Sequence, residues 1–427
     1  VLCGLSTSMP VLILFRILQG VGGGGLQPSE QAILADTFAP EQRNMAFSIY
    51  GMAVVVAPAL GPTLGGWITD NYSWHWIFFI NLPIGILSLF LTHRLIHDPP
   101  YIKKREAVER RRKDIDYAGI SLIVIGVGFL QYALDKGQEA GWLASHAIAL
   151  ALVLGIGGLG LLVWREVTYT NPIINLRLLA LRNFGAATLF NFILGMVLNG
   201  STILIPQFLQ AELGYTAERA GMALSAGGIA LALLMPVAGI LAQKFDSRKL
   251  IAFGFIVTSL TLFLLTMVYS TIDFNTIMWL RVLQVIGLPF IFIPISTLSY
   301  VGVPREENNQ VSGISNFSRN IGGAIGVSFL STFIARHEQI NRFDLVAHLN
   351  HGSIFFNNYF NGLISRSQGS TKYALAQLEQ MVSLQASTLA YVNAFWMMGL
   401  VVACLTPLPF LMRKPTPQDL AASEGMH

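Results

Sequence analysis

Charged residues are scarce in this sequence of 427 residues. Asp, Glu, Lys and Arg together make up 12% of it, about half of the roughly 25% that is usual in soluble domains. Hydrophobic residues make up 53%, and the mean hydropathy is +0.57. This composition excludes a soluble enzyme, a disordered chain and a nucleic-acid-binding protein, and it indicates an integral membrane protein.

Cysteine is scarce as well, and sequence motifs of catalysis are missing. Cys3 and Cys404 lie almost at opposite ends of the chain, so they predict neither a disulfide framework nor a cysteine metal cluster. The sequence contains no HExxH, no GxSxG and no phosphate-binding GKS/T pattern. We therefore expect no enzyme activity, no metal and no bound cofactor.

Long apolar stretches dominate what is present. A spanning helix needs about 20 mostly apolar residues, and eleven stretches satisfy this. They are 11–34, 45–67, 76–95, 116–135, 145–164, 183–205, 217–241, 251–270, 276–300, 311–335 and 388–411. The predicted fold class is an all-α membrane protein. Because the chain starts at Val1 within an apolar stretch, we expect that its beginning is missing.

Lys and Arg gather in alternate connections between these spans. Eighteen of the 27 lie on one side, including the basic run 102–114 and the C-terminal Arg413 and Lys414. Basic residues accumulate in cytoplasmic loops, so the 96–115 connection and the C-terminal tail are predicted to be cytoplasmic. The long 336–387 loop then lies outside, in the periplasm of a Gram-negative cell.

Two segments match without a gap at an offset of 265 residues. Polar matches include Arg16 with Arg281, Gln19 with Gln284, Glu41 with Glu306, and Asn44 with Asn309. Each copy is a helix, a cytoplasmic loop and a return helix, and both copies point the same way. Parallel repeats of this kind are typical of major facilitator transporters, which have six helices per half. The alternative is a chance similarity between Gly-rich helices.

The repeat predicts two pseudo-symmetric six-helix bundles with two inserted helices between them. The predicted parts are the remainder of the first bundle (1–95), the cytoplasmic linker with the inserted helices (96–182), the second bundle (183–411) and a cytoplasmic tail (412–427). The complete protein would have fourteen spans, of which about eleven are complete in this chain.

Three arginines stand inside predicted spans: Arg16, Arg281 and Arg319. A charge there costs about 2.5–3.5 kcal/mol on insertion scales, so it usually faces a bundle interior or a cavity. We predict that these three guanidiniums line the transport pathway and respond to protonation of a nearby carboxylate; a structural arginine is the alternative. For Arg281 this interpretation and a structural arginine that caps backbone carbonyls at a kink both stay open.

A proton-coupled exporter needs a membrane carboxylate that exchanges its proton. Glu30 is the best candidate in the sequence, followed by Asp36 at the end of the same predicted helix. Glu30 lies only about one turn from the predicted cytoplasmic boundary. A carboxylate at the mouth that pairs with a loop arginine is therefore an equally good interpretation, and a helix before Val1 is the alternative place for the main carboxylate.

Proline and glycine are concentrated in APALGPTLGG, residues 57–66. Pro58 and Pro62 each remove a backbone donor and disfavour a straight helix. Gly61, Gly65 and Gly66 allow a neighbour to pack against the resulting bend. A bent helix of this kind can rock against its partner during alternating access; an ordinary proline kink is the alternative.

The segment PVAGILAQKFDSRKL, residues 236–250, joins two predicted spans. Gly239 permits a close approach, and Asp246 can accept hydrogen bonds from the N-terminus of the following helix. Arg248 and Lys249 lie at the predicted cytoplasmic face. We interpret the segment as a latch that stabilises one conformation; anchoring by the positive-inside rule is the alternative.

These motifs together resemble those of a known family. LFRILQGVGGGG resembles the helix-4 motif of major facilitator drug exporters, APALGPTLGG the helix-5 antiporter motif and GILAQKFDSRKL the second-half loop motif. WHWIFFINLPIG, LIPQFLQAELGYTAERAG and NFSRNIGGAIG are similar to segments of the fourteen-helix drug:proton antiporters, specifically the EmrB-type multidrug exporters. The resemblance extends through to about residue 411.

The resemblance implies proton-driven export of hydrophobic or amphipathic toxic compounds across the inner membrane. It implies a periplasmic adaptor (a membrane fusion protein) and an outer-membrane channel as partners. It places Arg16 and Gln19 in the helix-4 motif; Gly61, Pro62, Gly65 and Gly66 in the antiporter motif; and Gly239, Asp246 and Arg248 in the loop motif. The alternatives are export of one endogenous metabolite or siderophore, and a non-transporting membrane scaffold or sensor.

The 336–387 loop is longer than most connections in compact proteins. Its final part, TKYALAQLEQMVSLQASTLAYVN, has a helical pattern of apolar residues and no Gly or Pro. We expect this part to project outward and to contact the adaptor; a partly disordered loop without a partner is the alternative.

Overall fold

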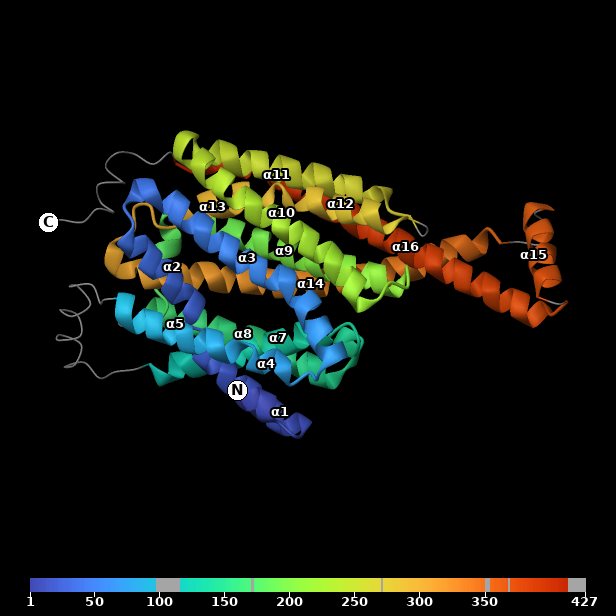
Figure 1. The fold of residues 1–427 in the computed structure, drawn as a ribbon, viewed down its shortest axis with the longest axis horizontal. Helices are drawn as coiled ribbons and strands as arrows, with labels where there is room; N and C mark the ends of the chain where they lie inside the picture. The colour runs from blue at the N-terminus through green and yellow to red at the C-terminus, as the bar shows by residue number, and fades with distance from the viewer. Residues whose placement is uncertain (97–115, 170–172, 270–271, 350–353, 368, 414–427) are drawn as a thin grey trace.

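The structure is a computed structural model, and it describes residues 1–96, 116–169, 173–269, 272–349, 354–367 and 369–413. Within these ranges all regular secondary structure is helical, which confirms the predicted fold class. Most of the helices run along the long axis of the molecule (Figure 1).

The helices follow one another in three groups. The first group is α1 (Met9–Gly23), α2 (Leu26–Thr37), α3 (Pro40–Asn71), α4 (Trp76–Phe79) and α5 (Asn81–Leu95). The second is the pair α7 (Tyr117–Lys136) and α8 (His146–Thr168). The third is α9 (Arg182–Ala211), α10 (Ala217–Lys244), α11 (Ser247–Leu264), α12 (Phe274–Val285), α13 (Leu288–Leu298), α14 (Asn308–Ala347), α15 (Ile354–Arg366) and α16 (Thr371–Leu405).

Helices cover each of the eleven predicted spans. Among the described residues, nine helical segments are long and apolar enough to cross a membrane. The two other predicted spans lie in α3 and α14, which have 32 and 40 residues. Both helices are long enough to span a bilayer, but they carry polar side chains that other helices cover, such as Ser48 on α3 and Ser312 on α14.

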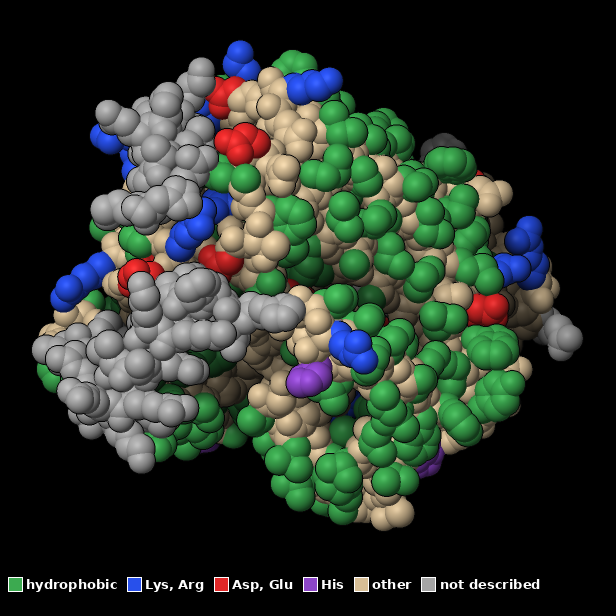
Figure 2. Space-filling model, turned by 60° about the vertical axis from the view of Figure 1, so that its left-hand side comes forward, with side chains coloured by type: hydrophobic (Ala, Val, Ile, Leu, Met, Phe, Trp, Pro, Cys, Tyr) green, Lys and Arg blue, Asp and Glu red, His purple; other side chains and the backbone are tan. Residues whose placement is uncertain are grey.

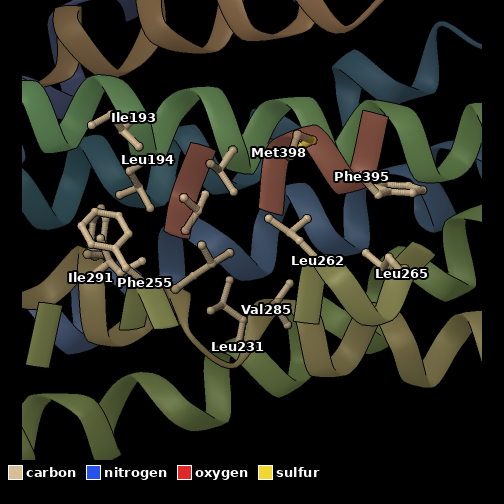
Figure 3. Packing of buried hydrophobic residues seen from close by; sticks show 14 of the residues in the cluster. Ile193, Leu194, Leu231, Phe255, Leu262, Leu265, Val285, Ile291, Phe395 and Met398 are labelled. Carbon is tan, nitrogen blue, oxygen red and sulfur yellow. The ribbon is translucent and has the colours of Figure 1, made fainter. Parts of the chain in front are cut away.

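A hydrophobic core joins the helices of the third group. Figure 3 shows part of it, where Leu194 of α9, Leu231 of α10, Phe255 of α11, Val285 of α12 and Phe395 of α16 pack together. By contrast, α1 and α5 bury no residue in the structure. The third group is therefore the most tightly packed part of the described chain.

Glycines set the distance between α9 and α14. A Cβ atom at Gly195 would lie 2.0 Å from the carbonyl oxygen of Arg319, and one at Gly322 would lie 2.1 Å from that of Phe192. Neither position has room for a side chain, so the two backbones touch, as small residues allow in membrane helix packing. This contact fixes the position of Arg319 along the axis of the bundle.

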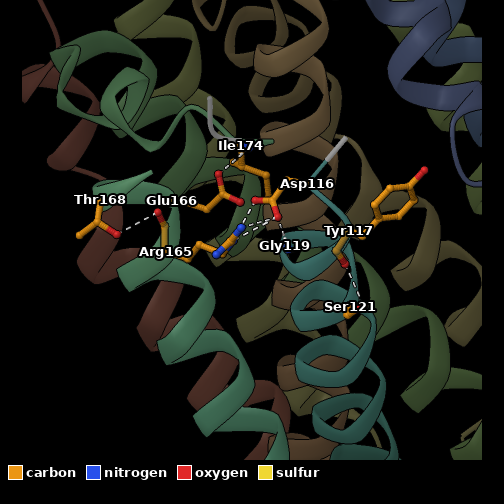
Figure 4. Close-up of polar contacts among 8 residues, drawn as sticks. All are labelled: Asp116, Tyr117, Gly119, Ser121, Arg165, Glu166, Thr168 and Ile174. Atoms are coloured by element: carbon orange, nitrogen blue, oxygen red, sulfur yellow. Dashed lines mark hydrogen bonds and ion pairs between the residues drawn. The ribbon is translucent and has the colours of Figure 1, made fainter. Parts of the chain in front are cut away.

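The predicted inserted helices form a hairpin, α7 and α8, closed by a polar clasp (Figure 4). Asp116 caps α7 by accepting from the backbone N–H of Gly119 at 2.8 Å. Arg165 of α8 donates to both carboxylate oxygens of Asp116 at 2.8 to 3.1 Å. Next to Arg165, Glu166 accepts from the backbone N–H of Ile174 at 3.0 Å. The clasp joins the first residue of the hairpin to its last turn.

The outer flank of the molecule is apolar. Leu89, Val153 and Leu233 are exposed to 73%, 67% and 70%. Figure 2 shows a flank on which hydrophobic side chains predominate and charged side chains are few. An exposed apolar surface of this extent is suited to contact with lipid. Helices can lie in lipid because they satisfy their own backbone hydrogen bonds.

The 336–387 segment is largely helical, which corrects the prediction of a loop. α14 continues to Ala347, α15 covers Ile354–Arg366, and α16 begins at Thr371. Together these ends project beyond the bundle in Figure 1. The helical pattern expected at the end of the segment is confirmed. The first part was missed because its residues are too polar to resemble a span, although they continue the helical turns of α14.

Candidate functional site

A cavity of about 210 Å³ lies between the first and third groups of helices. Its wall is mostly apolar and draws on α2, α3, α9, α10, α12, α13 and α14, with Val55, Leu198, Leu231 and Phe292 as examples. Two cationic side chains, Arg281 and Arg319, belong to this wall. The described lining residues include no carboxylate.

Arg281 is buried, with 6% of its surface exposed. Its Nη1 atom donates to the hydroxyl of Ser201 at 3.1 Å and to the side-chain oxygen of Gln284. Its Nη2 atom donates to the hydroxyl of Thr202 at 3.1 Å. Neutral partners satisfy part of the guanidinium but do not compensate its charge, so the cavity has a positive wall.

Arg319, the second cationic side chain of this wall, stands on α14. It donates to the side-chain oxygen of Asn316, and its guanidinium carbon lies 5.6 Å from the ring centroid of Phe292. Asn316 in turn donates to Gln31 of α2 at 2.9 Å. Arg319 is thus linked to the first group of helices through a buried amide pair.

Arg16 and Gln19 repeat the contact of Arg281 and Gln284. The Nη1 atom of Arg16 donates to the side-chain oxygen of Gln19 at 3.3 Å, so the predicted repeat extends to side-chain contacts. Arg16 is nevertheless exposed, and its guanidinium lies over the ring of Phe78, 4.7 Å from the centroid. Arg16 is therefore not among the described lining residues of this cavity, and α1 buries no residue in the structure. Its expected role in the transport pathway stays a prediction.

The two candidate carboxylates differ in their surroundings. Glu30 is exposed on α2, whereas its helix neighbour Gln27 lines the cavity and Gln31 is buried. Asp36 is half-buried and accepts from the side-chain amide of Asn308 at 2.5 Å. The structure thus places Asp36, and not Glu30, at a contact between the first and third groups. A proton-exchange role for either stays a prediction.

The antiporter motif lies on α3, which runs as one helix from Pro40 to Asn71. A Cβ atom at Gly61, Gly65 or Gly66 would have no described atom within 4 Å, so close packing at these glycines stays a prediction. A close contact occurs nearer the N-terminus of the same helix, at Gly51, where a Cβ atom would lie 2.9 Å from the ring of Phe292. Pro58 and Pro62 lie in α3, but their side chains are outside the described part.

The loop motif brings α10 against α3. A Cβ atom at Gly239 would lie 2.7 Å from the Cβ and Oγ atoms of Ser48, which confirms the expected close approach. Asp246 caps α11 by accepting from the backbone N–H of Arg248 at 3.0 Å, as expected, and it forms an ion pair with that side chain at 2.8 Å. Lys249 is exposed. Whether the segment acts as a latch stays a prediction.

The sequence did not predict which polar residues join the groups of helices. Asn44 donates to the carbonyl of Ala242 at 3.1 Å and accepts from the hydroxyl of Thr297 at 2.7 Å. The match of Asn44 with Asn309 in the sequence repeat was the one feature of the sequence that pointed to this residue. Ser201 and Thr202 could not be predicted from the sequence, because the long Arg281 side chain reaches their hydroxyls from a helix about 80 residues further along the chain.

Comparisons with known proteins agree with this architecture. A family model described as Major Facilitator Superfamily matches residues 1–327. The multidrug export protein EmrB of Escherichia coli (strain K12) is 34% identical over 97% of this chain and 79% of its own length. The fatty acid resistance protein FarB of Neisseria gonorrhoeae is 36% identical over 82% of this chain and 67% of its own length.

Two further proteins are similar to this chain. The probable multidrug resistance protein EmrY of Escherichia coli (strain K12) is 34% identical over 97% of this chain and 80% of its own length. A solved bacterial homologue of the human lysosomal transporter Spinster, in an inward-facing and occupied conformation, aligns with 98% of this chain and 80% of its own. That alignment has 14% identity and a TM-score of 0.47. By the family match and the EmrB and EmrY identities, the chain belongs to the Major Facilitator Superfamily and, within it, to the EmrB-type multidrug exporters, which are multi-pass proteins of the inner membrane.

Proposed function

We propose that this chain exports hydrophobic or amphipathic toxic compounds across the inner membrane in exchange for protons, as the inner-membrane part of a tripartite efflux pump. The observation that carries the proposal is the apolar cavity between the first and third groups of helices, with Arg281 and Arg319 in its wall. Apolar pockets with a few placed polar groups are the usual form of small-molecule sites.

The charge of the cavity favours hydrophobic weak acids among the possible substrates. Arg281 has only neutral hydrogen-bond partners among the described residues, and Arg319 donates to an amide. An anionic substrate would compensate these charges while its apolar part contacts Val55, Leu198 and Leu231. A cationic substrate would meet repulsion from the same wall.

Proton coupling is proposed from the family motifs and from the position of Asp36. As a carboxylate, Asp36 accepts a charge-assisted hydrogen bond from Asn308 of α14. Protonation would weaken this bond and favour separation of the first and third groups at that end. Arg16 and Glu30 remain members of the proposed coupling set on the strength of the sequence pattern alone.

The helical extension formed by the ends of α14 and α16 with α15 is the proposed contact for a periplasmic adaptor, through which an outer-membrane channel would be reached. Its exposed apolar side chains include Ile340, Phe343, Ile354 and Tyr373. The extension lies at the end of the bundle that charge placement predicts to be outside. Apolar side chains beyond the lipid-covered flank are typical of protein contact surfaces.

The decisive experiment measures proton flux in inverted membrane vesicles that contain the protein expressed from its full gene. Hydrophobic weak acids, uncharged toxins and cationic dyes are added in turn. We expect substrate-dependent flux that Arg281→Ala abolishes, whereas the matched control Arg219→Ala, an exposed arginine on α10, keeps it. Correct insertion of both variants is checked by gel filtration in detergent.

Other outcomes would overturn parts of the proposal. Flux with a single compound, and none with the other members of its class, would favour the exporter of one metabolite or siderophore. Absence of flux with every compound, in protein that inserts correctly, would favour the non-transporting scaffold or sensor.

A further inference from the structure

The two arginines in the wall of the central cavity differ in what holds them. The described hydrogen-bond partners of Arg281 all belong to the third group of helices: Ser201 and Thr202 on α9, and Gln284 on α12. A Cβ atom at Gly227 of α10, in the same group, would lie 3.0 Å from the Cγ atom of Arg281. These contacts fix Arg281 within the third group.

The hydrogen bond of Arg319 leads instead to the first group of helices. Arg319 donates to the side-chain oxygen of Asn316, which lies on the same helix, α14. The side-chain amide of Asn316 donates to the side-chain oxygen of Gln31 on α2 at 2.9 Å. Asn316 and Gln31 are 4% and 5% exposed, so this pair is buried between the two groups. The orientation of the oxygen that accepts from Arg319 therefore depends on the first group.

The ring contact of Arg319 leads to the first group as well. Its guanidinium carbon lies 5.6 Å from the centroid of the Phe292 ring on α13, within the range of a cation–π interaction. Phe292 is the one aromatic residue in the described lining of the cavity. A Cβ atom at Gly51 of α3 would lie 2.9 Å from the Cε1 atom of this ring and 3.2 Å from the Sδ atom of Met235. The ring fits against α3 because Gly51 has no side chain.

The two arginines should therefore respond differently when the groups of helices move. Alternating access requires the two halves of such a transporter to move relative to each other. If α2 and α3 move away from α13 and α14, Gln31 leaves Asn316 and Gly51 leaves the ring of Phe292. Arg319 then loses the support of both its partners, whereas the contacts of Arg281 stay intact. A cationic group that is held in place binds an anion more tightly than one that must first be ordered.

We propose that the first group of helices sets the affinity of the central cavity for acidic substrates by positioning Arg319. Gly51 acts through Phe292 and Gln31 acts through Asn316, so both are positioning residues. The affinity for acids is high in the arrangement of this structure and falls when the two groups separate at α3 and α13. The proposal rests on the proposed function, because it takes the central cavity as the substrate site.

The test measures the binding of octanoate, a hydrophobic acid, and of octanol, its uncharged counterpart. Both are titrated calorimetrically into the purified full-length protein in lipid nanodiscs, and the signal of protein-free nanodiscs is subtracted. We expect Gly51→Ala and Gln31→Leu each to weaken octanoate binding about threefold to tenfold, as the partial loss of a charge-specific contact implies, while octanol binding changes little. Gly157→Ala is the matched control, because Gly157 is exposed on α8 and a Cβ atom there would have no described atom within 4 Å. It should keep both affinities.

The route through Arg319 is tested in two further backgrounds. In Arg319→Gln protein, Gly51→Ala should weaken octanoate binding no further, because the group that it acts on is already gone. In Arg281→Gln protein, Gly51→Ala should weaken octanoate binding by the same factor as in the wild type. An additive loss in the Arg319→Gln background would overturn the proposal. Equal losses of octanoate and octanol binding in Gly51→Ala would do the same, because they would indicate a general distortion of the cavity.

Failure of this inference and failure of the proposed function give different results. Wild-type protein that binds octanoate no more tightly than octanol would contradict the acidic substrate class and this inference together. A wild-type preference for octanoate that neither Gly51→Ala nor Gln31→Leu reduces would contradict this inference alone. Binding that follows the expectations, in protein without proton flux, would contradict the proposed transport and support the positioning of Arg319.

Discussion

The side-chain amide of Asn44 donates to the carbonyl oxygen of Ala242 over 3.1 Å, and 198 residues of sequence separate the two. Asn44 stands near the start of α3, and Ala242 near the end of α10. The same asparagine accepts from Thr297 at 2.7 Å, so one buried side chain joins three helices. Together with the contact of Gly239 with Ser48, it closes the predicted cytoplasmic end of the bundle.

Replacement of the Asn44 side chain should destabilise the predicted cytoplasmic end of the bundle. Asn44→Ala leaves the buried Ala242 carbonyl and the Thr297 hydroxyl without this partner, so the free energy of unfolding should fall by about 1–2 kcal/mol. Hydrogen exchange of 238–244 should become faster. The measurement compares thermal unfolding and exchange with those of Asn71→Ala, whose exposed side chain bonds only to a carbonyl of its own helix. Equal behaviour of the two variants would refute the role of Asn44.

Two glycines should respond in opposite ways to alanine. Gly195→Ala places a Cβ atom 2.0 Å from the carbonyl oxygen of Arg319, so the backbones must separate and stability should fall by about 1–3 kcal/mol. Gly61→Ala meets no described atom within 4 Å and should leave stability unchanged or raise it by up to about 1 kcal/mol. Melting temperatures in one detergent decide the comparison. Marked destabilisation by Gly61→Ala would mean that this face of α3 is covered.

The charge of the substrate should matter at Arg319. Arg319→Gln removes a positive charge from the central cavity but keeps a side chain that can donate to Asn316. We expect the export of hydrophobic weak acids to fall on the order of tenfold, as the loss of one charge-assisted contact implies, while the export of uncharged toxins changes much less. Vesicle flux assays with both compound classes measure this. Arg342→Gln, on the exposed extension, is the control, and equal losses for both classes would contradict the prediction.

Glu212 should make stability depend on pH. Burial raises the pKa of its carboxyl from the ordinary value of 4.5, and nearby Glu338 raises it further, although the hydrogen bond from Ser387 acts in the opposite direction. Between 4.5 and the raised pKa the folded state binds more protons than the unfolded state, so stability falls as pH rises through this range. Glu212→Gln keeps an acceptor for Ser387. It should remove that pH dependence and raise the melting temperature at pH 7, as scans from pH 4 to 8 would show.

If the helical extension binds the adaptor as proposed, binding should be lost when its apolar surface is made polar. Phe343 is 76% exposed on the part of α14 that projects from the bundle. Phe343→Ser together with Tyr373→Ser should abolish co-purification of the periplasmic adaptor without affecting membrane insertion. Phe245→Ser, at the predicted cytoplasmic end, is the control because its side chain is also exposed. Undiminished co-purification would place the adaptor contact elsewhere.

The sequence was most informative about helices and least informative about contacts. Apolar length predicted a helix at each of the eleven places, and nine of the described helical segments are long and apolar enough to cross a membrane. The cap at Asp246 was predictable as well, since its partner lies two residues away. The course of residues 336–347 was not predictable, because its polar composition concealed a continuous helix.

Candidate site residues with the same local sequence pattern have different surroundings in the structure. Arg16 and Arg281 carry the same motif and the same contact to a glutamine three residues on, yet one is exposed and the other is buried in the cavity wall. Likewise, Gly61 and Gly195 are indistinguishable as helical glycines, but only Gly195 touches a neighbouring backbone.

The sequence by itself determined that this protein is a helical membrane protein, and it predicted a repeated half and an inserted helix pair. Those properties follow from local hydropathy, charge placement and an offset that can be counted along the chain. Only the tertiary structure decided which arginines share a cavity, which glycines bring helices into contact, and which asparagine joins α3 to α10. These depend on the rotation and height of each helix relative to its neighbours, which packing across long sequence separations sets.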